Sequence, residues 1–208
     1  MTTKKLAPIT IYAESTPNPG TMKFVANKVL INYGATIEYH GAEECDEAPL
    51  AKVLFTFPFV KSVFFASNFV TITKTDGIEW DDVVLELREY LINYLQADQP
   101  IFTKPPKKTQ HVTTNKETQE QEQISITATP ENEQEEKIIN LLEEYVRPAV
   151  EGDGGAIHFK SFESGTLTLK LSGACSGCPS STATLQGGIK NLFSRFMPEV
   201  KEVVAEDA

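Results

Sequence analysis

The chain contains 208 residues, a length that allows one large domain or two small ones. Hydrophobic residues make up 40% and charged residues 23%, which is typical of a globular protein. The net charge of −10 disfavours binding to nucleic-acid phosphates and to anionic membrane surfaces. Three cysteines are too few, and odd in number, for a secreted disulfide framework, so we expect a reducing compartment.

The sequence gives no indication of a targeting segment or a membrane span. Two lysines near the start are not followed by an apolar run, and residues 9–14 already predict a strand. The most apolar stretch, residues 53–72, contains Pro58 and Lys61, and a lysine inside a bilayer is costly. We therefore expect a cytoplasmic protein without a membrane-spanning helix.

Residues 104–134 differ sharply in composition from the rest of the chain. They are rich in Lys, Thr, Gln and Glu and contain no Phe, Tyr or Trp. Such a segment cannot bury enough apolar surface to offset its ordering entropy, so we predict a flexible polar linker. This leaves one domain over residues 1–103 and another over residues 135–208. Acidic residues outnumber basic ones in both, so neither is a concealed nucleic-acid-binding domain.

The N-terminal domain is predicted to be α+β, a sheet covered by helices. Helical spacing of apolar residues predicts a helix over residues 80–95, and a shorter helix at residues 48–57 would end at Pro58. Two prolines and a glycine predict a turn over residues 16–20. Short apolar or alternating runs predict strands at residues 9–14, 22–25, 35–39, 61–66 and 69–74.

The C-terminal domain is predicted to have the element order α-β-β-α-β. An apolar stripe from Ile138 to Val146 predicts the first helix, which Pro148 weakens and the glycine-rich turn at residues 152–155 ends. The remaining elements are a hairpin of residues 156–163 and 166–172, a helix over residues 180–196 and a strand over residues 200–204.

Cys175 and Cys178 lie between a predicted strand and a predicted helix. Their two-residue spacing lets both sulfurs turn toward one point, and Pro179 suits the first position of a helix. The free N–H groups and dipole of that helix would lower the thiol pKa values, and the thiolate is the form that binds metal. Gly173 and Gly177 on either side have no side chain and would leave room for a bulky ligand.

The number of available ligands suggests how this pair could hold a metal site. A structural zinc or a common iron–sulfur cluster takes four protein ligands, and one C-terminal domain supplies two. A two-fold dimer that brings Cys175 and Cys178 of both chains together completes the set. A small thiol such as glutathione is an alternative source. The chain contains four other possible metal ligands. Cys45 and His40 lie in the other domain, His111 lies in the linker and His158 lies on a predicted strand.

Two other interpretations of the cysteine pair remain open. A thiol–disulfide oxidoreductase also places such a pair at a helix start, but here proline follows the motif and the domain is too small for that fold. A structural zinc bridging a dimer is the other. The sequence contains no catalytic triad, paired carboxylates or phosphate loop, so we expect no enzymatic turnover.

Several conspicuous residues have simpler interpretations. Cys45 is flanked by carboxylates that disfavour its thiolate, so we expect a surface thiol without a ligand role. His158 is expected on the surface or in packing, and Trp80 in the core. Gly187 and Gly188 are costly inside a helix, so we expect close packing on the sheet or on a second subunit.

Several long motifs resemble one known family. The cysteine motif, Leu-Ser-Gly-Ala-Cys-Ser-Gly-Cys-Pro-Ser-Ser at residues 171–181, resembles the C-terminal domain of NifU-like (Nfu) proteins, as do residues 146–155 and 198–203. Residues 14–24, which include Ser-Thr-Pro-Asn-Pro-Gly, and residues 60–65 resemble the N-terminal Nfu domain.

This resemblance implies an iron–sulfur scaffold or carrier. A labile [4Fe-4S] cluster would be bound between two CxxC motifs, by Cys175 and Cys178 of a homodimer, and delivered to apo iron–sulfur proteins. Upstream cluster-assembly machinery would be a further partner. Because the N-terminal domain carries no group of metal ligands, we expect it to be an interaction module that helps select recipients.

Overall fold

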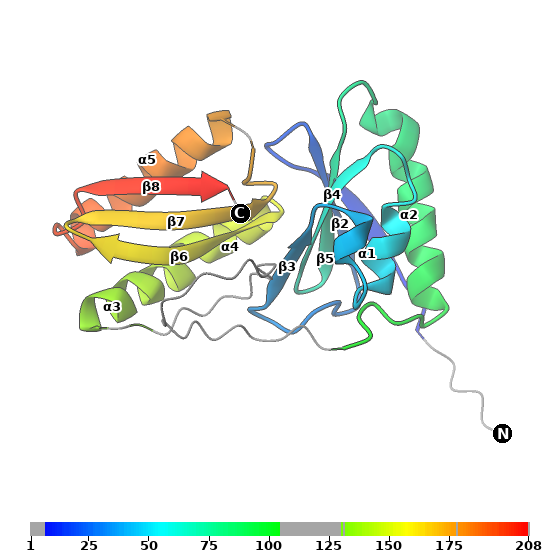
Figure 1. The fold of residues 1–208 in the computed structure, drawn as a ribbon, viewed down its shortest axis with the longest axis horizontal. Helices are drawn as coiled ribbons and strands as arrows, with labels where there is room; N and C mark the ends of the chain where they lie inside the picture. Colours follow the sequence, from blue (N-terminus) through cyan, green and yellow to red (C-terminus); the bar gives the residue numbers. More distant parts are fainter. Residues whose placement is uncertain (1–6, 105–129, 131, 178, 208) are drawn as a thin grey trace.

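The computed structural model describes residues 7–104, 130, 132–177 and 179–207 of the chain. It shows two α+β units side by side, which is the predicted fold class (Figure 1). Most of the predicted linker, residues 104–134, lies outside the described residues, so the domain boundaries remain a proposal. No helix in the described ranges is long and apolar enough to cross a membrane.

The N-terminal unit is built on an antiparallel sheet with strand order β1-β2-β5-β4-β3. A short 3-10 helix, η1 (Ala42–Glu44), precedes two helices that cover one face, α1 (Pro49–Leu54) and α2 (Trp80–Gln96) (Figure 1). The strands are β1 (Ile11–Ser15), β2 (Thr21–Ala26), β3 (Thr36–Tyr39), β4 (Val60–Ala66) and β5 (Phe69–Lys74).

Alternation along the strands gives this sheet two buried faces. In β4, Val63 and Phe65 pack into the main core beneath the helices. Phe64 and Ala66 point to the opposite face, as the two-residue period of a strand requires, and are also buried. The second face is covered by the C-terminal unit rather than by a helix of its own.

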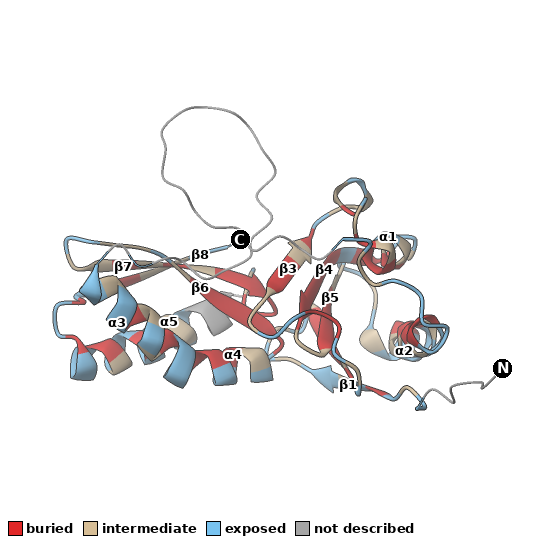
Figure 2. Ribbon diagram, turned by 90° about the horizontal axis from the view of Figure 1, so that it is seen from below, coloured by how far each residue is buried: buried red, intermediate tan, exposed pale blue. Residues whose placement is uncertain are grey.

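The C-terminal unit packs helices on one side of a three-stranded sheet with order β6-β7-β8 (Figure 2). Strands β6 and β7 form an antiparallel hairpin, and β8 joins β7 in parallel. The elements are α3 (Glu133–Leu141), the π-helical turn η2 (Leu142–Val146), α4 (Arg147–Gly152), β6 (Gly155–Glu163), β7 (Thr166–Gly173), α5 (Pro179–Phe196) and β8 (Glu202–Asp207).

The predicted opening helix is divided into three segments. Pro148 has no N–H to donate to the carbonyl of residue 144, and its ring crowds that carbonyl, so the chain widens into the π-turn η2 just before it. The helix begins at Glu133, earlier than the proposed boundary at 135. Asn132 explains this start, because its side chain accepts hydrogen bonds from the N–H groups of Gln134 and Glu135.

Other boundaries also differ from prediction, and the first strand begins at Ile11 rather than at residue 9. Helix α1 spans Pro49–Leu54 and is therefore shorter than the helix predicted over residues 48–57. The final strand begins at Glu202 rather than 200, because Val200 is buried in the core and the N–H groups of Lys201 and Glu202 donate to the carbonyl of Gly165.

Candidate functional site

Cys175 lies in the loop between β7 and α5, and its side chain is turned into the C-terminal core. We call residues 174–177 the cysteine loop. Cys175 is only 7% exposed, and a Cβ added to Gly155 would be 2.5 Å from its Sγ. Cys178, the second predicted ligand, lies outside the described residues. The structure therefore places one of the two predicted cysteines, in an inward-facing conformation.

Burial, with a smaller contribution from the nearby carboxylate of Asp153, raises the pKa of the Cys175 thiol to about 12. The expected lowering of this pKa by the helix N-terminus is wrong for the inward conformation. Helix α5 begins at Pro179, and the side chain of Cys175 packs in the apolar core of the C-terminal unit. In this conformation Cys175 is a buried, protonated thiol and not the thiolate form that binds metal.

The two glycines expected to leave room for a ligand differ. Gly177 has φ +71° and nothing within 4 Å of the position a Cβ would take, so the space there is open. Gly173 has φ +63°, but an added Cβ would be 2.8 Å from Cδ1 of Phe64. The expected open space at Gly173 is therefore absent, because Phe64 of the N-terminal unit and the carbonyl oxygen of Gly154, also at 2.8 Å, occupy it.

A loop of the N-terminal unit contacts the cysteine loop directly. Asn18 Nδ2 donates to the carbonyl oxygens of Ala174 at 3.3 Å and Ser176 at 3.2 Å. Its Oδ1 accepts from the N–H of Gly20 at 3.0 Å, which fixes the amide in this orientation. Trp80 supports the same loop, because its Nε1 donates to the carbonyl of Pro19 at 3.0 Å. Trp80 was expected in the core, but it is only partly buried and packs against the core.

One transverse row of the N-terminal sheet faces the C-terminal unit. The strand register aligns Lys23 with Thr71, Thr71 with Phe64, and Phe64 with Glu38. We call these four residues the docking row. Because directly paired residues lie on one face of a sheet, the row presents an amine, a hydroxyl, a ring and a carboxylate in sequence.

The docking row binds backbone groups just before the start of β6 and at the end of β7. The bonds are Lys23 Nζ to Gly152 O at 3.1 Å, Thr71 Oγ1 to Gly154 O at 2.6 Å, and Gly173 N to Glu38 Oε2 at 2.9 Å. Phe64 of the row also forms a buried apolar cluster with Ala66, Phe69 and Ala156 of β6. The glycine-rich turn predicted at residues 152–155 is therefore part of a contact between the two units.

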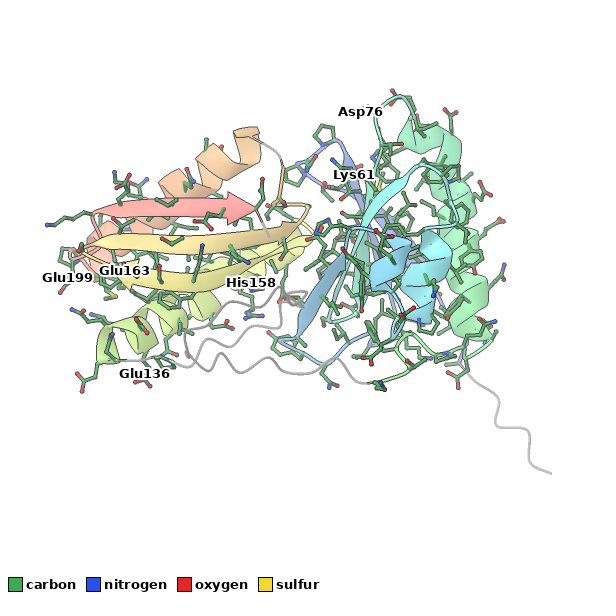
Figure 3. All side chains as sticks on the ribbon, in the orientation of Figure 1. Lys61, Asp76, Glu136, His158, Glu163 and Glu199 are labelled. Carbon is green, nitrogen blue, oxygen red and sulfur yellow. The ribbon has the colours of Figure 1, made fainter. Side chains whose placement is uncertain are left out.

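His158 of β6, labelled in Figure 3, lies at the contact between the two units and is buried. Its Nε2 is 3.0 Å from Ser172 Oγ and 3.5 Å from Thr36 Oγ1 of the N-terminal unit. Burial, with smaller contributions from the positive charges of Arg147 and Lys170, lowers its pKa to about 3. His158 is a packing residue, one of the two roles expected for it.

Cys45 does not belong to this site. Its side chain is fully buried in the N-terminal core, so the expected surface position is wrong. Burial raises its pKa to about 12, with the carboxylate of Glu44 as a further cause, which agrees with the expected disfavour of the thiolate. His111 lies outside the described residues. Among the residues that are described, no three His, Cys, Asp or Glu side chains come close enough to hold a metal.

Sequence reasoning missed the contact between the two units. Asn18 and Ala174 are 156 positions apart, and no local pattern relates them. The available signals were Lys23 and Thr71, polar residues in otherwise apolar strands, and the proline-rich motif shared with Nfu proteins.

Comparison with known families gives two matches that together cover most of the chain. The family model for the scaffold protein Nfu/NifU N terminal matches residues 11–98, and the model for the NifU-like domain matches residues 138–204. The chain belongs to the NifU-like (Nfu) family.

Individual NifU-like proteins are similar along almost the whole chain. NifU-like protein 5, mitochondrial, of Arabidopsis thaliana is 35% identical over 94% of this chain and 67% of its own length. The NFU1 iron-sulfur cluster scaffold homolog, mitochondrial, of Drosophila erecta is 33% identical over 93% of this chain and 63% of its own. The chain thus spans about two thirds of the length of these relatives. The solution structure of a NifU-like protein from Saccharomyces cerevisiae is 22% identical over 50% of this chain and 91% of its own, with a TM-score of 0.40.

The prediction of a cytoplasmic location is wrong, because it conflicts with these relatives, whose names describe them as mitochondrial. The expectation rested on composition and cysteine number. Receptors direct proteins to compartments by recognising separate targeting signals, and composition and cysteine number do not encode such signals.

Proposed function

We propose that this protein is an iron–sulfur cluster scaffold and carrier. It would hold a labile [4Fe-4S] cluster, as cargo, through Cys175 and Cys178 and transfer it to apo iron–sulfur proteins. The observation that carries this proposal is the CxxC motif between β7 and α5 in a chain of the NifU-like family. The Drosophila relatives, named iron-sulfur cluster scaffold homologs, support it.

The proposed cluster is shared by two chains. Each chain provides two thiols in the motif and a cluster takes four ligands, so a homodimer completes the set. Gly187 and Gly188 are compatible with this, because each is exposed on α5 with nothing within 4 Å of an added Cβ. Packing on the chain's own sheet thus does not account for them, whereas a second subunit would.

The chain's own residues would bind and release the cargo without chemical turnover. The open space at Gly177 leaves room for a bulky inorganic group beside the cysteine loop. Cys175 turns outward and loses its proton as it binds, since thiolate is the ligand form. A ligand set divided between two subunits can open when the subunits separate, which suits transfer. Upstream assembly machinery would supply the cluster.

The N-terminal unit is proposed to act as an interaction module that helps choose recipients. Among its described residues it contains no group of metal ligands, which leaves protein contact as its proposed contribution.

Anaerobic reconstitution with iron and sulfide tests the cluster assignment. We expect about one four-iron cluster per dimer. Cys175→Ser or Cys178→Ser should abolish the brown chromophore, whereas Cys45→Ser is the matched control and should retain it. Iron and sulfide analysis, combined with sedimentation of the loaded protein, gives the stoichiometry.

Three results would contradict the proposal. Zinc bound without sulfide would favour a structural zinc dimer. A complete cluster on a monomer would show that a small thiol supplies the missing ligands. Steady disulfide reduction by the apo-protein, lost in Cys175→Ser, would indicate a thiol oxidoreductase.

A further inference from the structure

The contact between the two units holds Cys175 in its inward conformation. Asn18 bonds the carbonyl groups of Ala174 and Ser176, the residues immediately before and after this cysteine. One of these carbonyls belongs to the peptide group between Ala174 and Cys175, and the other to the peptide group between Ser176 and Gly177. A rearrangement of the cysteine loop backbone that turns the thiol outward would therefore break these bonds.

The docking row fixes the ends of the same loop. Glu38 accepts from the N–H of Gly173, which directly precedes the cysteine loop. Phe64 lies so close to Gly173 that no larger residue fits there. Thr71 binds the carbonyl of Gly154, which itself accepts from the N–H of Ala174. The N-terminal unit therefore holds the cysteine loop at its start, at its middle and through the adjacent turn.

The chemistry of this contact is suited to reversible closure. Its apolar part is a small cluster of Phe64, Ala66, Phe69 and Ala156, and its polar part consists mainly of single hydrogen bonds to backbone groups, together with the Thr36–His158 side-chain contact. Contacts of this kind between domains of one chain open readily, while the covalent connection keeps the partners at high local concentration.

We propose that this face of the N-terminal sheet, together with Asn18, is a reversible cover for the cysteine loop. Its occupant in the apo-protein is the chain's own C-terminal unit, and cluster binding with a second copy displaces it. The inference rests on the proposed function for the second step only. Because closure and cluster binding exclude each other, each weakens the other by the same factor.

The test uses Asn18→Asp in the full-length apo-protein. The carboxylate keeps the size of the side chain and the bond from Gly20, but it replaces the two donated bonds with repulsion from two carbonyl oxygens. Asn32→Asp is the matched control, because it adds the same charge at an exposed loop position of the same unit. Iodoacetamide labelling of Cys175, followed by peptide mass spectrometry, measures how often the loop opens.

We expect Cys175 in Asn18→Asp to be labelled at least about tenfold faster than in the control, the change for two lost hydrogen bonds of ordinary strength. Thr71→Val, which removes the hydroxyl bond to Gly154 without adding charge, should also accelerate labelling. Reconstitution with iron and sulfide should be faster in both variants. Labelling of Cys175 at the control rate in both variants would contradict the proposal that the N-terminal unit covers the cysteine loop.

The experiment separates this inference from the proposed function. Faster labelling in a protein that binds no cluster would support the cover while contradicting the scaffold assignment. Faster labelling with unchanged cluster loading would contradict the inference that closure of the contact and cluster binding exclude each other. Denaturant unfolding of each variant, with a midpoint near that of the parent, shows that labelling reports the loop and not global unfolding.

Discussion

Gly155 lies directly beneath the sulfur of Cys175. An added Cβ would be 2.5 Å from Sγ, 2.8 Å from the carbonyl oxygen of Ser172 and 2.9 Å from the N–H nitrogen of Cys175. Two of these three neighbours are backbone atoms, which cannot rotate away. The absence of a side chain at this position is thus what allows the inward conformation of the thiol.

Gly155→Ala should therefore lower the free energy of unfolding by about 1–3 kcal/mol, the usual cost of overpacking. Gly152→Ala is the control, because nothing lies within 4 Å of its added Cβ and the residue is at the end of α4. It should be neutral or slightly stabilising, since alanine is favoured in helices. Urea unfolding compares the two, and equal stabilities would contradict the packing argument.

His158 makes the apo-protein sensitive to mild acid. Its pKa is about 3 in the folded protein and about 6.5 in an unfolded chain, so only the unfolded state binds the proton between these values. Stability is complete above pH 6.5 and falls as the pH drops below it. The slope is about 1.4 kcal/mol per pH unit, or about 2 kcal/mol between pH 6.5 and 5.

The matched variant is His158→Gln, which keeps a polar side chain near Ser172 but does not titrate. The charged groups that act on the histidine, Arg147 and Lys170, are unchanged in it. Denaturant unfolding at several pH values should show a shallower dependence for the variant than for the parent. Parallel pH profiles would show that another group is responsible.

At the scale of elements, local sequence patterns were sufficient to predict those helices and strands whose packing follows from their own apolar spacing. Helical spacing of apolar residues predicted α2, and two short runs predicted the strands at residues 61–66 and 69–74, which pair as the hairpin of β4 and β5. The π-turn η2 was not predicted, because Pro148 indicates only that a helix is disturbed and not how the chain accommodates it. The later start of β8 depends on the carbonyl of Gly165, which is remote in sequence.

The start of α3 depends on a single side chain, that of Asn132. Its Oδ1 accepts from two N–H groups that would otherwise be unpaired, so Asn132→Ala should cost about 1 kcal/mol. Asn140→Ala, an exposed position within the same helix, is the control and should be neutral or stabilising. Thermal unfolding compares the two variants. Equal melting temperatures would contradict the capping role.

At the scale of the whole molecule, the candidate site was only half predictable. Cys175 and Cys178 were found because a short motif carries them. The burial of Cys175 was not, because it results from the second face of a sheet that belongs to the other unit. Contacts between units depend on the complete fold, and a single sequence shows them only as polar residues in apolar strands.

Removing residues 1–103 separates the two proposed roles of the chain. The C-terminal unit has a core of its own, so cluster assembly on Cys175 and Cys178 should continue. Transfer to at least some apo-proteins should become slower, because the unit proposed to recognise them is missing. Transfer rates to several recipients measure this, and unchanged rates for all of them would exclude a targeting role.

Trp80 has a practical consequence. It is the single tryptophan of the chain, and its indole donates a hydrogen bond to the loop that carries Asn18. The ammonium group of Lys74 lies 5.9 Å from the centre of its ring. Indole fluorescence depends on hydrogen bonding and on nearby charge, so a movement of this loop will shift the emission of the unlabelled protein. The molecule thus carries its own optical reporter next to the residues that contact the cysteine loop.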